Sequence, residues 1–256
     1  MLLDRNKLKV DGFITFNLSD IDTILFEELK NKLRKEELAQ YITNFRFDGV
    51  SDSSIYDNPE SLKKIIKDFG FVNFQFDFNA HHGSEFHFRA NIQNSNIDKL
   101  LQFENIISSK VSSFSQLWFY NNYTKENNDL LHNIFKKTIF ELYTEELKNY
   151  PFEFGQSQVD LTLFKKNNFI INHRDGFNEG RVCVLLMYLN DDYEVGFGGE
   201  LKIGDIIIEP KLGNIVILDF VDNNVEHEVT PVLNENFKRF ALTRFFHLPE
   251  KKVNFI

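Results

Sequence analysis

Three side chains that can bind a transition metal lie in the second half of the sequence, namely His173, Asp175 and His227. Residues two positions apart on an extended strand point to the same face, so His173 and Asp175 can converge on one ion. His227 would come from a later strand that a closed barrel brings alongside. Two imidazoles and one carboxylate on one side of an ion leave its other side open. This arrangement suits non-haem Fe(II), whose free positions bind a co-substrate and dioxygen.

The same pattern can also arise without any metal-binding role, because a short His-x-Asp sequence occurs by chance and a histidine at a strand end is commonly a surface or core residue. Arg239 adds weight to the functional interpretation, since it opens the last strand-like run twelve residues after His227. Guanidinium groups bind carboxylates through two parallel hydrogen bonds. An arginine inside a barrel needs an anion, which a bound dicarboxylate would supply.

Short strands are the elements that would position these residues. From Gln156 onward, β-rich runs alternate with turn residues and the helical period disappears. About eight strands favour an all-β barrel or a double-sheet jelly roll. They are predicted over roughly 156–164, 168–173, 181–190, 199–203, 205–209, 214–220, 226–232 and 239–247.

Residues 1–150 carry mainly helical patterns. Ser19 and Asp22 are typical helix caps, and apolar residues from Ile21 to Leu33 recur every four positions. Further patterns predict helices over about 61–70, 95–107 and 131–142 and a β-hairpin over about 72–78 and 86–90. We expect an α+β fold in which region 1–150 packs on a catalytic core over 151–256. The two regions would form one structural unit, with the first walling the substrate pocket.

Composition and charge exclude several classes of protein. With 42% hydrophobic and 26% charged residues, the sequence is that of an ordinary globular chain. A net charge of -9 with no basic run argues against nucleic-acid binding, which depends on phosphate contacts. A single cysteine, Cys183, excludes an internal disulfide and a thiolate cluster. No apolar run has the length of a signal peptide or membrane span, so a cytoplasmic protein without membrane association is expected.

Five ordered segments resemble a known enzyme family. They are HRDGFNEGRVCVLLMYLND, GGELKI, IEPKLGNIVILDF, HEVTPV and RFALTRFFH. Over about residues 156–248 they are similar to the Fe(II)- and 2-oxoglutarate-dependent dioxygenases, and specifically to the prolyl-4-hydroxylase-like branch. The resemblance implies a double-stranded β-helix, which is a jelly roll, in agreement with the strand pattern.

The resemblance also implies roles for single residues. His173, Asp175 and His227 would be the iron ligands and thus the catalytic residues. Arg239 would bind the distal carboxylate of 2-oxoglutarate, and Tyr188 matches a tyrosine that often donates a hydrogen bond to the same group. Thr243 has the inward parity of the last strand and is expected to line this cofactor pocket.

Two departures from the family pattern fall in the expected substrate pocket. Phe164 stands where a tyrosine is common, and Phe245 stands where a tryptophan is common. They belong to a sequence unusually rich in phenylalanine, with 29 Phe against 8 Tyr and 1 Trp. In related halogenases a small residue replaces the ligand aspartate, so Asp175 favours hydroxylation.

Arginine spacing separates the chain from a further branch of the superfamily. AlkB-like nucleic-acid demethylases carry two arginines six residues apart on the last strand, whereas Arg239 and Arg244 are five apart here. An odd spacing places the two on opposite strand faces. Nucleic-acid repair is therefore not expected.

Two other features need interpretation. Arg181 and Tyr188 are seven residues apart and face opposite ways on a regular strand, so Arg181 is predicted to be a surface charge unless a bulge intervenes. His81, His82 and His87 could form a second metal site, but a substrate-facing loop is the preferred interpretation.

The leading functional hypothesis is a hydroxylase that acts on an sp3 carbon of a small molecule, such as a free amino acid or a natural-product intermediate. It would need Fe(II), 2-oxoglutarate and dioxygen, with ascorbate as an optional stimulant, and would release succinate and CO2. Peptidyl-prolyl hydroxylation is the alternative. A non-catalytic jelly roll that binds a ligand or partner is the alternative of another class. Nothing in the sequence predicts the oligomeric state.

Overall fold

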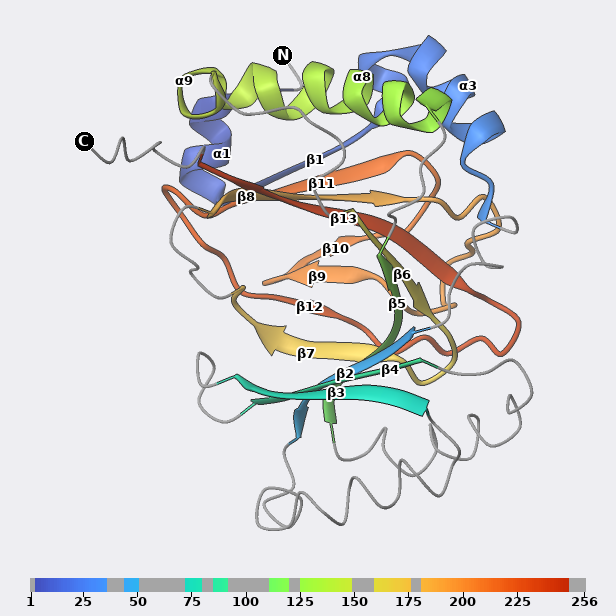
Figure 1. The fold of residues 1–256 in the computed structure, drawn as a ribbon. Coiled ribbons are helices and arrows are strands. Elements are labelled where there is room, and N and C mark those ends of the chain that lie inside the picture. The colour runs from blue at the N-terminus through green and yellow to red at the C-terminus, as the bar shows by residue number, and fades with distance from the viewer. Residues whose placement is uncertain are drawn as a thin grey trace.

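The computed structural model describes residues 3–35, 44–50, 72–79, 85–91, 111–119, 125–148, 159–175 and 181–248. The helices predicted over 61–70 and 95–107 and the loop with His81 and His82 lie outside these residues. In the described part of the chain, two antiparallel sheets face each other and helices cover one of them (Figure 1). No helix there is long and apolar enough to cross a membrane.

Among the described residues, eight strands form the jelly-roll core as two four-stranded sheets, which β5 (Val111–Phe119) joins into one continuous hydrogen-bonded path. The first sheet has the order β11-β8-β13-β6 and the second the order β7-β12-β9-β10. All eight predicted strands are present, which confirms the predicted fold. They are β6 (Asp160–Phe164), β7 (Phe169–His173), β8 (Arg181–Tyr188), β9 (Leu201–Ile203), β10 (Ile206–Ile208), β11 (Asn214–Asp219), β12 (His227–Val229) and β13 (Arg239–His247).

Strand β13 shows how residue alternation divides the interior into two parts. Phe240 and Leu242 pack into the cluster beneath the helices, whereas Ala241 and Phe245 pack into the cluster between the two sheets. Both faces of this central strand are therefore apolar, as expected for a strand that is covered on both sides. Arg239, at an odd position, shares the side that faces the second sheet.

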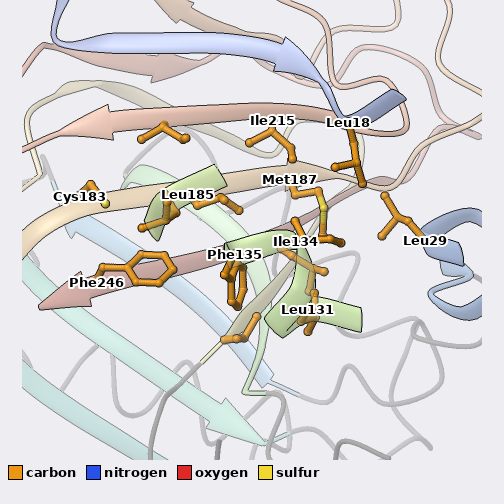
Figure 2. Packing of buried hydrophobic residues seen from close by; sticks show 14 of the residues in the cluster. Leu18, Leu29, Leu131, Ile134, Phe135, Cys183, Leu185, Met187, Ile215 and Phe246 are labelled. Atoms are coloured by element: carbon orange, nitrogen blue, oxygen red, sulfur yellow. The ribbon is translucent and has the colours of Figure 1, made fainter. Parts of the chain in front are cut away.

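In the part of the chain that the structure describes, five helices pack on the outer face of the first sheet. They are α1 (Arg5–Asp11), α2 (Leu18–Ile21), α3 (Thr23–Lys32), α8 (Lys125–Leu142) and α9 (Thr144–Leu147). The Asp22 carboxylate caps α3 by accepting hydrogen bonds from the backbone N–H groups of Ile24 and Leu25, each at 3.1 Å. Figure 2 shows Leu131, Ile134 and Phe135 of α8 against Leu185 and Met187 of β8. The predicted padding of the sheet by helices is confirmed.

Strands from the first half of the chain extend the core. The predicted hairpin is confirmed as β3 (Val72–Asn79) paired with β4 (Glu85–Asn91). The sequence did not predict β1 (Phe13–Asn17), β2 (Asn44–Val50) or β5 (Val111–Phe119). Strand β1 pairs with β11, and β2 pairs with β4 and β5.

Strand β5 links the two sheets of the jelly roll. Its residues Gln116–Phe119 pair with β6 of the first sheet, while Ser113 and Phe114 pair with β7 of the second. One side of the barrel is thus closed by a strand from the region before residue 150. The division of the chain at that residue stays a prediction.

Candidate iron centre

His173 and His227 are directly opposite each other in the ladder between β7 and β12. Their ring centroids are 4.4 Å apart. Asp175 lies two residues beyond the end of β7, and its carboxylate oxygens are 3.9 Å from His173 Nε2 and 3.7 Å from His227 Nε2. The ligand atoms of all three residues lie within 4.8 Å of one another. The structure therefore brings together the three residues singled out from the sequence.

The surroundings of His227 suit a metal ligand. Its side chain is 7% exposed, and burial lowers its pKa, with the nearby Asp175 charge acting in the opposite direction. Nδ1 lies 3.2 Å from the carbonyl oxygen of Val225. A hydrogen bond there places the proton on Nδ1 and leaves the Nε2 lone pair directed toward Asp175 and His173. Neutral imidazole in this tautomer is the form that binds a metal.

The backbone of Asp175 has an orienting partner that the sequence did not reveal. Asn224 donates a hydrogen bond from Nδ2 to the Asp175 carbonyl oxygen at 3.0 Å. Asn224 lies in the segment between β11 and β12 that precedes His227. Nearby, Asn172 donates to the Glu226 carboxylate at 3.0 Å on the exposed surface.

Arg239 is buried at the start of β13, with 2% of its surface exposed. Its Nε donates a hydrogen bond to the carbonyl oxygen of Gly199 at 2.6 Å, and its Nη2 lies 3.5 Å from the Tyr188 hydroxyl. The guanidinium also lies 4.8 Å from the Phe164 ring centroid and 5.0 Å from that of Tyr188. Among the described residues it forms no ion pair, so the cation is held by backbone and rings and can accept an outside anion.

Gly199 allows Arg239 to come this close. Its φ of +80° is a backbone conformation that glycine adopts readily, and an added Cβ would lie 2.9 Å from Arg239 Cδ. The next residue, Glu200, accepts a hydrogen bond from the Tyr193 hydroxyl at 2.6 Å and another from the Thr230 hydroxyl. Burial alone would raise the pKa of Glu200, but these two hydrogen bonds, a backbone hydrogen bond and the nearby Arg239 charge together lower the pKa. The turn that presents the Gly199 carbonyl is therefore firmly anchored.

The remaining predicted pocket residues lie on the inner side of the first sheet. Phe164 is 1% exposed and pairs with Arg239 across the β6–β13 ladder. Phe245 is half-buried and stacks on Phe220, with centroids 6.2 Å apart and an interplanar angle of 13°. Thr243 is half-buried and shares the parity of Arg239 and Phe245. Tyr188 is completely buried.

Arg181 points inward because a bulge intervenes. Residue pairing shifts between Phe246 opposite Cys183 and His247 opposite Arg181, so β8 has one extra residue at this point. The shift reverses the parity of Arg181, whose guanidinium lies 4.2 Å from the centroid of the Phe245 ring. The surface position expected for a regular strand is thus corrected. A single-residue bulge leaves no signature in the local sequence.

Arg244 and Cys183 lie on the opposite, helix-facing side of the sheet. Arg244 is 1% exposed and its guanidinium lies 5.0 Å from the ring centroids of both Phe135 and Phe246. The two arginines of β13 therefore face opposite ways, as their spacing predicts. Cys183 is fully buried, and burial raises the pKa of its thiol. This agrees with an inert core thiol.

The donor set fits Fe(II), because two imidazole nitrogens and one carboxylate oxygen lie within 4.8 Å of one another. Residues 159–247 match the family described as the 2OG-Fe(II) oxygenase superfamily. The fold is similar to that of a Pseudomonas putida prolyl-4-hydroxylase, with a TM-score of 0.51, 14% identity, and coverage of 95% of this chain and 96% of that one.

An oxidoreductase of the 2OG-Fe(II) oxygenase family from Burkholderia pseudomallei is more distant, with a TM-score of 0.36, 12% identity, and coverage of 59% of this chain and 80% of that one. No curated protein matches the chain in sequence. The family match implies Fe(II), 2-oxoglutarate and dioxygen, and His173, Asp175 and His227 could form the iron site. The match over residues 159–247, together with the three metal-binding side chains that the structure brings together, supports an oxygenase of the 2OG-Fe(II) class.

Proposed function

We propose that this oxygenase hydroxylates an sp3 carbon of a small molecule that carries a carboxylate, such as a free amino acid. The observation that carries the proposal is the pair of inward-facing arginines at the two ends of β13. Arg239 begins this strand, and Arg181 pairs with its last residue, His247. Two cations on one inner face can hold two anions, one belonging to the co-substrate and the other to the substrate.

In this proposal, His173, Asp175 and His227 hold the iron. Arg239 binds the distal carboxylate of 2-oxoglutarate with help from the Tyr188 hydroxyl, and Thr243 lines the same pocket. When bound, Fe(II) and 2-oxoglutarate would activate dioxygen, one oxygen atom of which would enter the C–H bond and the other the succinate that forms with CO2. The protein contributes placement, because its fixed donors hold the reacting groups at the required positions.

Phe164 and Phe245 serve as apolar walls in this account. Both are rings without a polar group, and Phe164 is almost completely buried. Apolar walls exclude water from the reacting carbon and strengthen the electrostatic attraction between each arginine and its anion. The cation of Arg181 on the Phe245 ring is the group that would select an anionic substrate, since guanidinium binds carboxylate with two hydrogen bonds.

A closed barrel side favours a small substrate. Among the described residues, β5 pairs with both β6 and β7, so its backbone lies between these two strands, where a long peptide would otherwise have to bind. The prediction that the region before residue 150 walls the pocket is consistent with this arrangement. A cytoplasmic location and the absence of a nucleic-acid partner stay predictions.

Peptidyl-prolyl hydroxylation is the second candidate. It is favoured by the similarity in fold to the Pseudomonas putida enzyme, which extends over 95% of this chain. A purely ligand-binding jelly roll is disfavoured, because such a module has no need of both a facial triad and a buried arginine poised for an anion.

Succinate formation in the presence of candidate substrates tests the substrate class. The iron-loaded protein would be supplied with 2-oxoglutarate and a panel of free amino acids, their amides, and proline-containing peptides with blocked ends. We expect stimulation by free carboxylates and not by the matching amides. Stimulation by blocked proline peptides alone would refute the small-molecule proposal and favour the second candidate.

A further inference from the structure

The loop between β11 and β12, residues 220–226, contacts two of the three proposed iron ligands at atoms that do not face the metal. Asn224 Nδ2 donates to the carbonyl oxygen of Asp175 at 3.0 Å. The Val225 carbonyl lies 3.2 Å from His227 Nδ1. Two consecutive residues of one loop therefore orient ligands that come from different strands.

Asp175 needs such support more than the two histidines do. His173 and His227 are paired in the β7–β12 ladder, whereas Asp175 lies beyond the last residue of β7. The carboxylate therefore depends on contacts outside the ladder for its position. Among the described residues, the Asn224 amide is the side chain that hydrogen-bonds its backbone.

The loop is itself fixed at its other end by the buried carboxylate of Asp219. Its Oδ2 accepts hydrogen bonds from the backbone N–H groups of Asp222 at 2.7 Å and Asn223 at 3.0 Å. Its Oδ1 accepts from the Tyr143 hydroxyl at 2.6 Å and from Arg5 Nη1 at 3.2 Å. A fully buried carboxylate is costly unless it is paired and hydrogen-bonded, and here four donors satisfy it.

Helix α1 completes this support from the beginning of the chain. Arg5 Nη2 reaches Asp222 at 2.8 Å and Glu146 at 3.2 Å. Past the middle of the helix, the Val10 carbonyl accepts a hydrogen bond from Asn223 Nδ2 at 2.9 Å. The chain then turns at Gly12, where an added Cβ would lie 2.4 Å from Val225 Cγ1. Helix α1 and the loop are thus packed without a gap.

We propose that Asn224 is a positioning residue for the iron site, and that helix α1 holds the 220–226 loop in the place from which Asn224 and Val225 orient Asp175 and His227. The inference rests on the proposed iron ligands. Removing a group that orients a metal ligand typically lowers metal affinity by roughly ten- to a hundred-fold. The N-terminal helix would therefore influence iron binding although it supplies no ligand.

Mn(II) affinity measured by calorimetry tests the proposal directly, because Mn(II) occupies the same type of site without oxidising. Asn224→Ala removes the donor, and Asn224→Asp keeps the shape but replaces the donor by an acceptor. We expect both to weaken Mn(II) binding by about tenfold or more. Asn234→Ala is the matched control, since the Asn234 side chain also supports a turn, by accepting from the backbone N–H groups of Asn236 and Phe237, but has no hydrogen bond to an iron ligand or to the 220–226 loop among the described residues. Its affinity should equal that of the parent.

A role in folding alone would give a different pattern. If Asn224 positions the ligand, the metal-free Tm of Asn224→Ala should match that of Asn234→Ala, while the rise in Tm on adding Mn(II) should shrink only in Asn224→Ala. Equal Mn(II) affinity in the parent and both Asn224 variants would overturn the inference. Arg5→Ala extends the test to the helix and should also weaken Mn(II) binding in the folded protein, as judged by unchanged circular dichroism.

His173→Ala distinguishes this failure from a failure of the proposed function. If His173→Ala abolishes Mn(II) binding but the Asn224 variants bind Mn(II) normally, the iron site is supported and the positioning role of Asn224 is refuted. If His173→Ala leaves Mn(II) binding unchanged, both the assignment of the iron ligands and this inference are refuted.

Discussion

His173 and His227 face each other as a directly paired couple across the β7–β12 ladder, with ring centroids 4.4 Å apart. The register of these two short strands thus places two imidazoles that can bind a metal next to each other. The properties of the site should depend on the groups that surround these two side chains.

The pH dependence of folding should report the burial of His227. Because burial lowers its pKa below the ordinary value of 6.5, the unfolded chain binds more protons than the folded one as the pH falls through this value. The contribution of His227 to the stability of the metal-free protein should therefore be fully present above about pH 6.5 and decrease below it. Urea midpoints measured between pH 7.5 and 5.5 would show this decrease.

Replacement of His227 by glutamine should reduce the dependence of stability on pH without removing it. Burial also lowers the pKa values of His132 and His247, so these groups contribute stability changes of the same sign. An undiminished slope in His227→Gln would mean that His227 does not titrate as its burial requires.

Arg239→Lys should raise the KM for 2-oxoglutarate by at least about tenfold, since lysine cannot form two parallel hydrogen bonds with a carboxylate. The buried guanidinium is held by the Gly199 carbonyl at 2.6 Å, and a shorter ammonium cannot reproduce this contact. Initial rates of succinate formation against 2-oxoglutarate concentration give the value. A KM equal to that of the parent would show that another cation binds the co-substrate.

Gly199→Ala should weaken 2-oxoglutarate binding through Arg239. Its Cβ would lie 2.9 Å from Arg239 Cδ, so the guanidinium must shift. Gly196→Ala is a matched control, because Gly196 also has a positive φ, +94°, but its added Cβ meets nothing within 4 Å. Both variants should lose about 1–2 kcal/mol of stability from the unfavourable φ, and only Gly199→Ala should raise the KM. Equal KM values in the two would mean that Arg239 is not displaced.

Arg181→Gln should raise the KM for the substrate and leave the KM for 2-oxoglutarate unchanged. The Arg181 guanidinium stacks on Phe245, at the end of β13 away from Arg239. Succinate formation without substrate should likewise be unaffected. A parallel rise in both KM values would indicate general damage to the pocket and would argue against a separate substrate anion site.

The sequence predicted the jelly roll well because its strands alternate sharply and are bounded by strong turn residues. The limits of β13 agree with the predicted 239–247, and Arg239 and Arg244 lie on opposite faces as their spacing requires. His173 and Asp175 could be linked to His227 from the sequence, because few types of side chain bind a transition metal and few residues could therefore complete the site.

Other features depend on contacts between distant segments and could not be read locally. Strand β5 carries three serines and becomes a strand by pairing with β2, β6 and β7. Arg181 turns inward through a one-residue bulge, and Asn224 gains its role only because the chain beyond β11 returns to Asp175. Hydrophobic periodicity carries no information on such contacts.

The central claim is that His173, Asp175 and His227 would hold the Fe(II) at which dioxygen oxidises 2-oxoglutarate. Succinate released per protein, after anaerobic loading with Fe(II) and exposure to 2-oxoglutarate and dioxygen, tests it most directly. We predict succinate formation by the parent protein even without added substrate, and its loss in His173→Ala together with the loss of bound iron. No succinate from the parent, or undiminished iron binding and succinate in His173→Ala, would contradict the claim.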